Sequence, residues 1–167
     1  MSYDHSLCGN GSLKEGVALN QLVDALAPLF EYLGIDGEKA FLGTAKVPMG
    51  FEFYYLPESR AFSLNTYGEV GWSFDDAVEA CCNGLCSIVD AAGSMRLVNH
   101  DTGDIDNAVS EYFFGPTSEA IEQYSFDGDM AEIRGLLSAH LADTAVDQLV
   151  AQICDAFAKS SQKEVIA

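Results

Sequence analysis

Apolar side chains recur at helical spacing between residues 16 and 33, and this pattern constrains the fold more than any other feature of the chain. Most stand three or four residues apart, on one face of a helix: Leu19, Leu22, Val23, Leu26, Leu29, Phe30 and Leu33. Pro28 lies within the pattern and should kink the helix, because its ring removes one amide donor and crowds the preceding turn. The segment therefore predicts a kinked amphipathic helix that ends near Gly34.

Three segments rich in aromatic and β-branched residues follow, at 41–47, 50–56 and 61–67, with proline-containing turns between them. They predict an antiparallel meander. In the middle segment Glu52, Tyr54 and Leu56 alternate with residues of the opposite face, so neither face is wholly polar. Such a strand is either covered on both sides or offers one side to a partner.

A second helix is predicted from Ser73, where the spacing to Asp76 resembles a capping box, to near residue 93. Two strands at 95–99 and 108–114 come next, joined by a turn-rich loop. The helical region 129–159 contains a further start signal at Thr144, which allows a break near Ala142. The sequence therefore predicts an α+β fold of order α-β-β-β-α-β-β-α, with an antiparallel sheet packed by amphipathic helices.

The domain organisation follows from length and composition. The chain of 167 residues suffices for one domain of ordinary size, which we place at 16–159. Residues 1–15 read as a flexible N-terminal arm, because the glycine-rich stretch 9–12 lacks the preceding strand and following lysine of a phosphate-binding loop. Residues 160–167 read as a frayed C-terminal tail.

The net charge of −18 excludes several classes of partner. Such a field repels nucleic acid and anionic membranes, and it favours basic proteins or imitates a nucleic acid. The alternative is a coat that only keeps the protein soluble. Residues 90–155 contain thirteen acidic and two basic residues. An acidic interaction face is therefore predicted there, and its candidate residues are Asp101, Asp104, Asp106, Glu111, Asp127 and Asp129.

The cysteines and the N-terminus indicate the compartment. No signal peptide or membrane-spanning run is recognisable, and an odd number of cysteines suits reduced thiols, so we expect a cytoplasmic protein. Cys81, Cys82 and Cys86 could share a helical face as soft metal ligands, but no fourth ligand lies at a familiar spacing. Packing in a buried helix face is the better interpretation.

The sequence contains no catalytic motif. The run 101–111 resembles a calcium loop superficially, but from Asp104 the twelfth position is Gly115 instead of glutamate. The three histidines belong to no metal or catalytic signature. A histidine paired in space with a thiol stays open as a nucleophile and base. We expect no enzyme activity, no metal and no cofactor.

The order of elements and the stretch MRLVNHDTGDIDNAVSEYFF, which follows the second helix, resemble the class I type III secretion chaperones over residues 19–157. The resemblance implies an acidic cytoplasmic homodimer that carries an extended effector segment in grooves of the first helix and the sheet, partly by strand addition. By position the groove residues would be Leu22, Leu26, Phe53, Tyr55, Tyr112 and Phe114. The sequence departs from the family in the stretch 116–129 and in the divided final helix.

Two functions from different classes remain open. The first is an escort that binds an extended segment of a partner protein, and it requires that part of the aromatic strands serve as an interface as well as core. The second is an acidic inhibitor, either a toxin immunity protein or a nucleic-acid mimic such as an anti-defence protein, which blocks a basic cleft.

Overall fold

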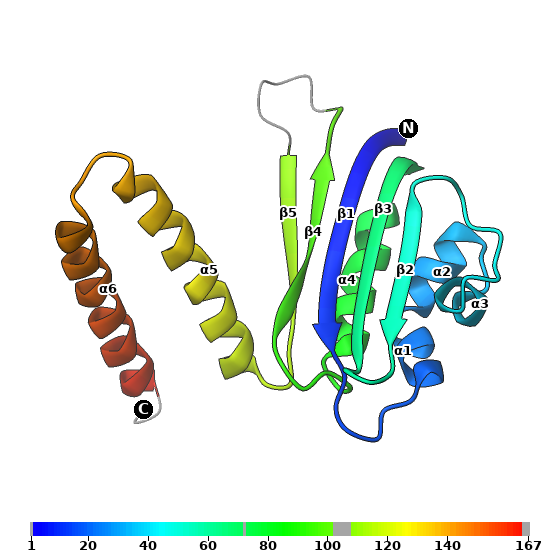
Figure 1. Cartoon of the computed structure of the whole chain (residues 1–167), viewed down its shortest axis with the longest axis horizontal. Helices are drawn as coiled ribbons and strands as arrows, with labels where there is room; N and C mark the ends of the chain where they lie inside the picture. Colours follow the sequence, from blue (N-terminus) through cyan, green and yellow to red (C-terminus); the bar gives the residue numbers. More distant parts are fainter. Residues whose placement is uncertain (1, 72, 102–107, 165–167) are drawn as a thin grey trace. The chain divides into compact units, whose positions relative to one another are not determined.

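The computed structural model describes residues 2–71, 73–101 and 108–164. Its elements are β1 (Ser2–Ser12), α1 (Leu19–Ala25), α2 (Ala27–Leu33), α3 (Gly37–Phe41), β2 (Phe51–Leu56), β3 (Ala61–Gly71), α4 (Ser73–Leu85), β4 (Gly93–Asn99), β5 (Ala108–Phe114), α5 (Ser118–Ser138) and α6 (Asp143–Glu164) (Figure 1). They form two compact units, Met1–Glu122 and Gln123–Ala167, instead of the single predicted domain 16–159. The predicted α+β class with an antiparallel sheet is confirmed.

The first unit is built on a five-stranded antiparallel sheet of order β2-β3-β1-β4-β5. β1 is its central strand: it pairs with β3 from Ser2 to Ser12 and with β4 from His5 to Gly9. The predicted flexible arm at 1–15 is therefore wrong. The sequence did not predict this strand because glycine is unfavourable in strands. In the structure the glycines are required, because large side chains of neighbouring strands lie where a Cβ would be. A Cβ at Gly9 would lie 2.9 Å from Met95 Cγ, and one at Gly11 would lie 2.9 Å from the ring of Phe62.

The predicted first strand at 41–47 is also wrong. Its first residue ends α3, which begins because the Asp36 carboxylate accepts a hydrogen bond from the Lys39 backbone N–H at 3.1 Å and so caps the helix. The aromatic ring of Phe41 packs edge-on against Phe30 and Phe53, with ring centroids 5.8 and 5.9 Å apart. The aromatic content of this segment serves helix packing and not a sheet.

The predicted kink at Pro28 is a complete break. α1 ends at Ala25, and Pro28 lies in the first turn of α2, where its missing N–H is no loss. The helices α1 to α4 lie on one face of the sheet: α3 contacts β2, α4 contacts β4 and β5, and α1 and α2 pack against α4 (Figure 1). The core between helices and sheet contains fully buried leucines from both layers, including Leu7, Leu29 and Leu64. The strands alternate buried and exposed residues, as expected for a sheet covered on one face.

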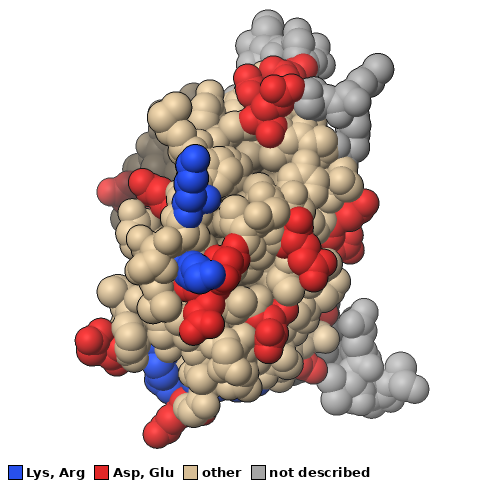
Figure 2. Space-filling model, turned by 90° about the vertical axis from the view of Figure 1, so that its right-hand side faces the viewer, with Lys and Arg blue, Asp and Glu red and all other residues tan. Residues whose placement is uncertain are grey.

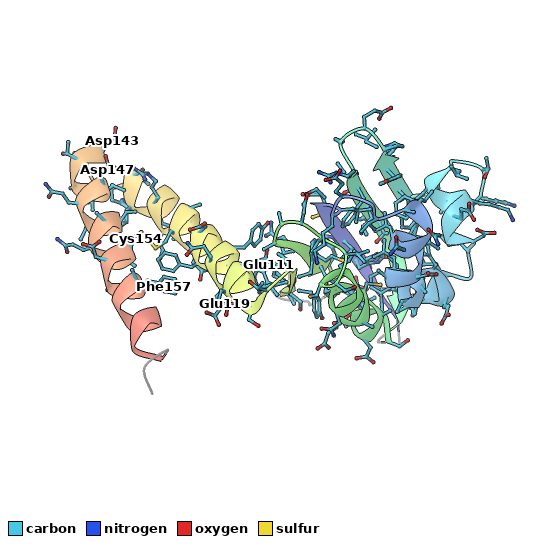
Figure 3. All side chains as sticks on the ribbon, turned by 90° about the horizontal axis from the view of Figure 1, so that it is seen from below. Glu111, Glu119, Asp143, Asp147, Cys154 and Phe157 are labelled. Carbon is cyan, nitrogen blue, oxygen red and sulfur yellow. The ribbon has the colours of Figure 1, made fainter. Side chains whose placement is uncertain are left out.

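The second unit contains α6 and most of α5, and the predicted break near Ala142 is confirmed by the gap between them. The rings of Phe126 and Phe157 stack across the two helices with centroids 3.9 Å apart. Figure 3 labels Phe157 between the two helices. Arg134 forms an ion pair with Asp147. The predicted frayed tail at 160–167 is helical as far as Glu164. Among the described residues, no helix has the length and apolar character to span a membrane.

Candidate functional site

The predicted groove residues lie inside the first unit. Leu22, Leu26 and Phe114 are fully buried, and Phe53 is buried in the same core cluster. Tyr55 and Tyr112 are partly buried and pack against that cluster. These side chains all contribute to the layer between sheet and helices, which the chain fills with its own residues. A partner segment therefore cannot enter a groove at these positions without displacing the core.

The opposite face of the sheet carries no helix within the described part of the first unit, and we refer to it as the helix-free face. Strand register aligns its side chains in rows across the sheet. One row runs through Glu52, Asn65, Cys8, Arg96 and Glu111, and crosses all five strands. The apolar side chains exposed on this face are Tyr54, Leu56, Tyr67 and Val109, at 53%, 58%, 59% and 49% exposure. Tyr54 and Leu56 are neighbours on this face, whereas the row through Glu52 and Asn65 separates them from Tyr67. Contiguous exposed apolar side chains such as Tyr54 and Leu56 are a feature of interaction surfaces.

A shallow groove of about 260 Å³ lies at the β2 side of this face. It is lined by Asn10, Gly11, Tyr54, Leu56, Ala61, Phe62 and Ser63. Register places Tyr54 opposite Ser63 and Ser63 opposite Asn10, so an aromatic ring, a hydroxyl and an amide follow one another along a single row. Pockets for small ligands are usually about 300–1,000 Å³, so this groove suits a side chain of a peptide better than a cofactor.

The predicted acidic face is divided among separate places. Asp101 accepts a hydrogen bond from the Asp4 backbone N–H at 2.9 Å, and Glu111 accepts one from the Ser94 hydroxyl at 2.6 Å. Asp127 and Asp129 are exposed in the second unit. Asp104 and Asp106 lie outside the described residues. Figure 2 shows the first unit from the side of β2 and α3, where carboxylates are scattered with few Lys and Arg between them.

The thiols of α4 are poorly suited to nucleophilic chemistry. Burial raises the pKa of Cys81 to about 11 and that of Cys82 to about 12, so both are protonated at neutral pH. Among the described residues, no group of three or more His, Cys, Asp and Glu side chains could hold a metal ion. The interpretation of these cysteines as packing residues agrees with their burial in the core cluster.

His5 is the one fully buried histidine of the described chain. Its Nδ1 lies 2.5 Å from the carbonyl oxygen of Gly68, and its Nε2 lies 2.7 Å from Thr66 Oγ1. The ring packs between Phe74 and Phe51, at centroid distances of 4.5 and 6.1 Å. Both ring nitrogens are therefore occupied by β3, and His5 is not the partner of a thiol. Burial lowers its pKa from the ordinary value of 6.5, an effect that the hydrogen bond to Gly68 opposes.

This pKa predicts a pH-dependent contribution to stability. Because the folded pKa lies below the unfolded one, the contribution is complete above about pH 6.5 and is lost as the pH falls below that value. We expect His5→Gln to destabilise the protein at pH 7.5 and to do so progressively less as the pH falls to 5. Urea unfolding of both proteins at each pH gives the difference between their free energies of unfolding. The titration of the carboxylates, which is common to both proteins, cancels in this difference. His140→Gln, at an exposed position in the turn after α5, is the control. A His5→Gln difference that stays constant or grows as the pH falls would contradict the prediction.

None of the apolar residues exposed on the helix-free face was among the predicted groove residues. The sequence pattern that indicated this face lies in β2, where Glu52, Tyr54 and Leu56 form a face that is not wholly polar. The groove also needs Asn10 and Ser63, which come together only through the pairing of β1 with β3. Because residues 1–15 were predicted to be an arm, no sequence signal connected Asn10 with Tyr54.

No curated protein and no solved structure matches the chain. A protein-family model described as a family of unknown function, DUF6806, matches residues 4–158. The match begins in the central strand β1, extends across both units and ends within α6. The chain therefore belongs to DUF6806, a family of unknown function.

Proposed function

We propose that the protein is a non-catalytic, acidic protein-binding domain that escorts an extended segment of a partner protein on the helix-free face of its sheet. The observation that carries the proposal is the row of Tyr54, Ser63 and Asn10 beside exposed Leu56, which together line a groove of about 260 Å³. Aromatic and aliphatic side chains give contact area, and the hydroxyl and amide can bond to peptide groups.

The position of the groove favours an extended occupant. β2 lies at one end of the sheet, and among the described residues its pairing is with β3 alone. The edge of β2 away from β3 has no strand partner, although α3 contacts β2 as well. Backbone N–H and C=O groups at such an edge can pair with an added segment as a further strand. A segment that pairs there places alternate side chains toward Tyr54 and Leu56. This geometry supports strand addition at a different place from the one that the resemblance to secretion chaperones implies.

The acidic charge of the domain indicates which amino acids the bound segment of the partner should contain. Glu52 lies in the same strand as Tyr54 and Leu56, and Glu69 and Asp4 are exposed and paired in register on the same face. With a net charge of −18, the whole field attracts cationic sequences. We therefore expect segments that alternate apolar residues with Lys or Arg.

Selection from a random peptide library tests this proposal. We expect wild-type protein to enrich extended apolar and basic peptides, and Tyr54→Ser with Leu56→Ser to weaken their binding by at least about tenfold, as for loss of interface anchors. The matched control is Leu42→Ser with Met49→Ser, since these side chains are 60% and 98% exposed but lie outside the strands of the sheet. Binding that is unaffected by the Tyr54 and Leu56 substitutions, or no enrichment at all, would contradict the proposal.

A second candidate function, the acidic inhibitor, is favoured by the exposure of carboxylates on α5. Glu119, Glu122, Asp127, Asp129 and Glu132 are all exposed along this helix. Affinity for a folded basic protein that falls steeply between low and moderate salt would favour this function, because exposed charge pairs are screened over about 10 Å at 0.1 M salt. Peptide binding that changes little with salt favours the escort.

A further inference from the structure

β5 is the last strand of the sheet, at the end opposite to β2 (Figure 1). Among the described residues it pairs with β4 alone. The first half of the strand is accessible to solvent: Ala108 and Glu111 are exposed, and Val109 is 49% exposed. An edge strand of this kind presents a row of backbone N–H and C=O groups with which a further strand can pair.

The hydrogen-bond pattern of the sheet determines which backbone groups of β5 lie at its outer edge. The His100 N–H donates to the Asp4 carbonyl oxygen at 2.8 Å, so His100 bonds to β1. Partners alternate along an antiparallel strand, so every second residue before His100 also bonds to β1, and the residues between them bond to β5. Met95 is one of these, and it lies opposite Tyr112. Tyr112 therefore bonds to β4, and the residues whose backbone groups point to the outer edge include Val109 and Glu111.

The side of β5 that faces the helices is acidic. α4 contacts β5, and the Cys82 thiol donates to the Tyr112 carbonyl oxygen at 3.5 Å. Glu79 lies three residues before Cys82 and so occupies the same stripe of α4. Burial raises the pKa of Tyr112, and three nearby carboxylates raise this pKa further, those of Asp75, Glu79 and Asp76. The side chain of Tyr112 therefore lies among negative charges.

These carboxylates have no cation beside them in the same elements, since neither α4 nor β5 contains Lys or Arg. Asp76 and Glu79 are exposed, and neither forms an ion pair among the described residues. Asp76 lies in the first turn of α4, where negative charge stabilises a helix, but Glu79 lies beyond that turn. On the helix-free face, by contrast, Arg96 lies opposite Glu111. The uncompensated negative charge is thus on the helix-facing side of the edge.

We infer that the outer edge of β5 binds an extended basic segment of another protein as a further strand, and that a Lys or Arg of this segment lies beside Tyr112. Because Tyr112 bonds to β4, the residue opposite it on an added antiparallel strand forms a non-hydrogen-bonded pair, in which side chains are closest. A cationic side chain there contacts the aromatic ring and is attracted by the carboxylates of Asp76 and Glu79. Backbone pairing supplies affinity, and the cation supplies specificity.

A short labelled peptide of alternating threonine and valine with one central lysine is the probe, and fluorescence anisotropy measures its binding to the full chain. We expect Val109→Pro to weaken binding by at least about tenfold, because proline removes an N–H group at the outer edge and leaves the pairing with β4 intact. Val109→Ala is the matched control, which loses the same side chain and should bind nearly as well as the wild type. Thermal unfolding shows whether both variants are folded.

The charge of the site is tested by a second pair of variants. Asp76→Asn with Glu79→Gln should weaken binding of the lysine peptide by at least about tenfold, as for loss of interface anchors. Asp24→Asn with Glu31→Gln removes two exposed carboxylates from α1 and α2 and should leave binding unchanged. A second peptide, with norleucine in place of lysine, should bind weakly to all of these proteins.

Three results would overturn the inference: no binding of the lysine peptide, equal affinities of the two Val109 variants, or equal effects of the two pairs of charge substitutions. A wild-type dimer that Val109→Pro dissociates would overturn it as well, because a second copy of the chain would then occupy the edge. The inference concerns a different edge from the groove beside β2. Tyr54→Ser with Leu56→Ser should therefore leave binding of this peptide unchanged, and its loss in that variant would place the peptide in the groove instead.

Discussion

Leu7→Ala should lower the free energy of unfolding by about 2–5 kcal/mol, which is the usual cost of deleting a buried leucine side chain. Leu7 is 1% exposed and lies at the middle of β1, with Leu97 opposite it on β4 and Thr66 opposite it on β3. Its side chain faces the helices and belongs to the core cluster. Urea unfolding followed by circular dichroism measures the effect.

The neighbouring residue supplies the control for this prediction. Cys8 is exposed on the helix-free face, so Cys8→Ala should change the free energy of unfolding by less than about 0.5 kcal/mol. Both substitutions shorten a side chain in the same strand, and they differ in the face that the side chain occupies. Equal and small effects would mean that residues 1–15 are an arm after all, and the central position of β1 would then be wrong.

Phe114→Ala should destabilise the protein by about 3–5 kcal/mol, because it removes a large ring from a site that cannot collapse readily. Phe114 is fully buried, and glycines on β4 and β1 leave room for its ring. A Cβ at Gly93 would lie 2.7 Å from Phe114 Cζ, and one at Gly11 would lie 3.2 Å from the same ring. Thermal and urea unfolding both report this loss.

The comparison residue is Phe113, which is partly buried and faces the other side of β5. Phe113→Ala should cost roughly 1 kcal/mol, the typical effect of a single substitution. The pair also separates two roles for Phe114. If Phe114 lined a partner groove, its loss would reduce binding and leave stability nearly unchanged; as a core residue, it should reduce stability first.

The sequence correctly predicted the elements in which the side-chain pattern and the backbone propensity of neighbouring residues agree. The apolar periodicity of residues 19–33 became α1 and α2, and the second start signal at Thr144 marked the beginning of α6. The strands at 50–56 and 108–114 followed from aromatic content and turn residues. In each case the side chains and the backbone favour the same structure, so the neighbouring residues suffice.

The failures share a physical cause. β1 contains glycines at positions 9 and 11, and only the neighbouring Met95 and Phe62 explain why small residues are needed there. Phe41 has the composition of a strand residue, but the Asp36 cap and the rings of Phe30 and Phe53 place it in a helix. The contacts with Met95, Phe62 and Phe53 come from residues distant in sequence, which intrinsic propensity does not include, whereas the Asp36 cap is a local signal.

The sequence by itself determined the charge, the α+β class and the apolar side chains available for a core. The tertiary structure decided which of those side chains are inside, because the position of β1 fixes which face of every strand the helices cover. It placed Phe53 and Phe114 in the core and left Tyr54, Leu56 and Tyr67 exposed. Residues adjacent in a strand point to opposite faces, so the register of one central strand separates exposed residues from core residues.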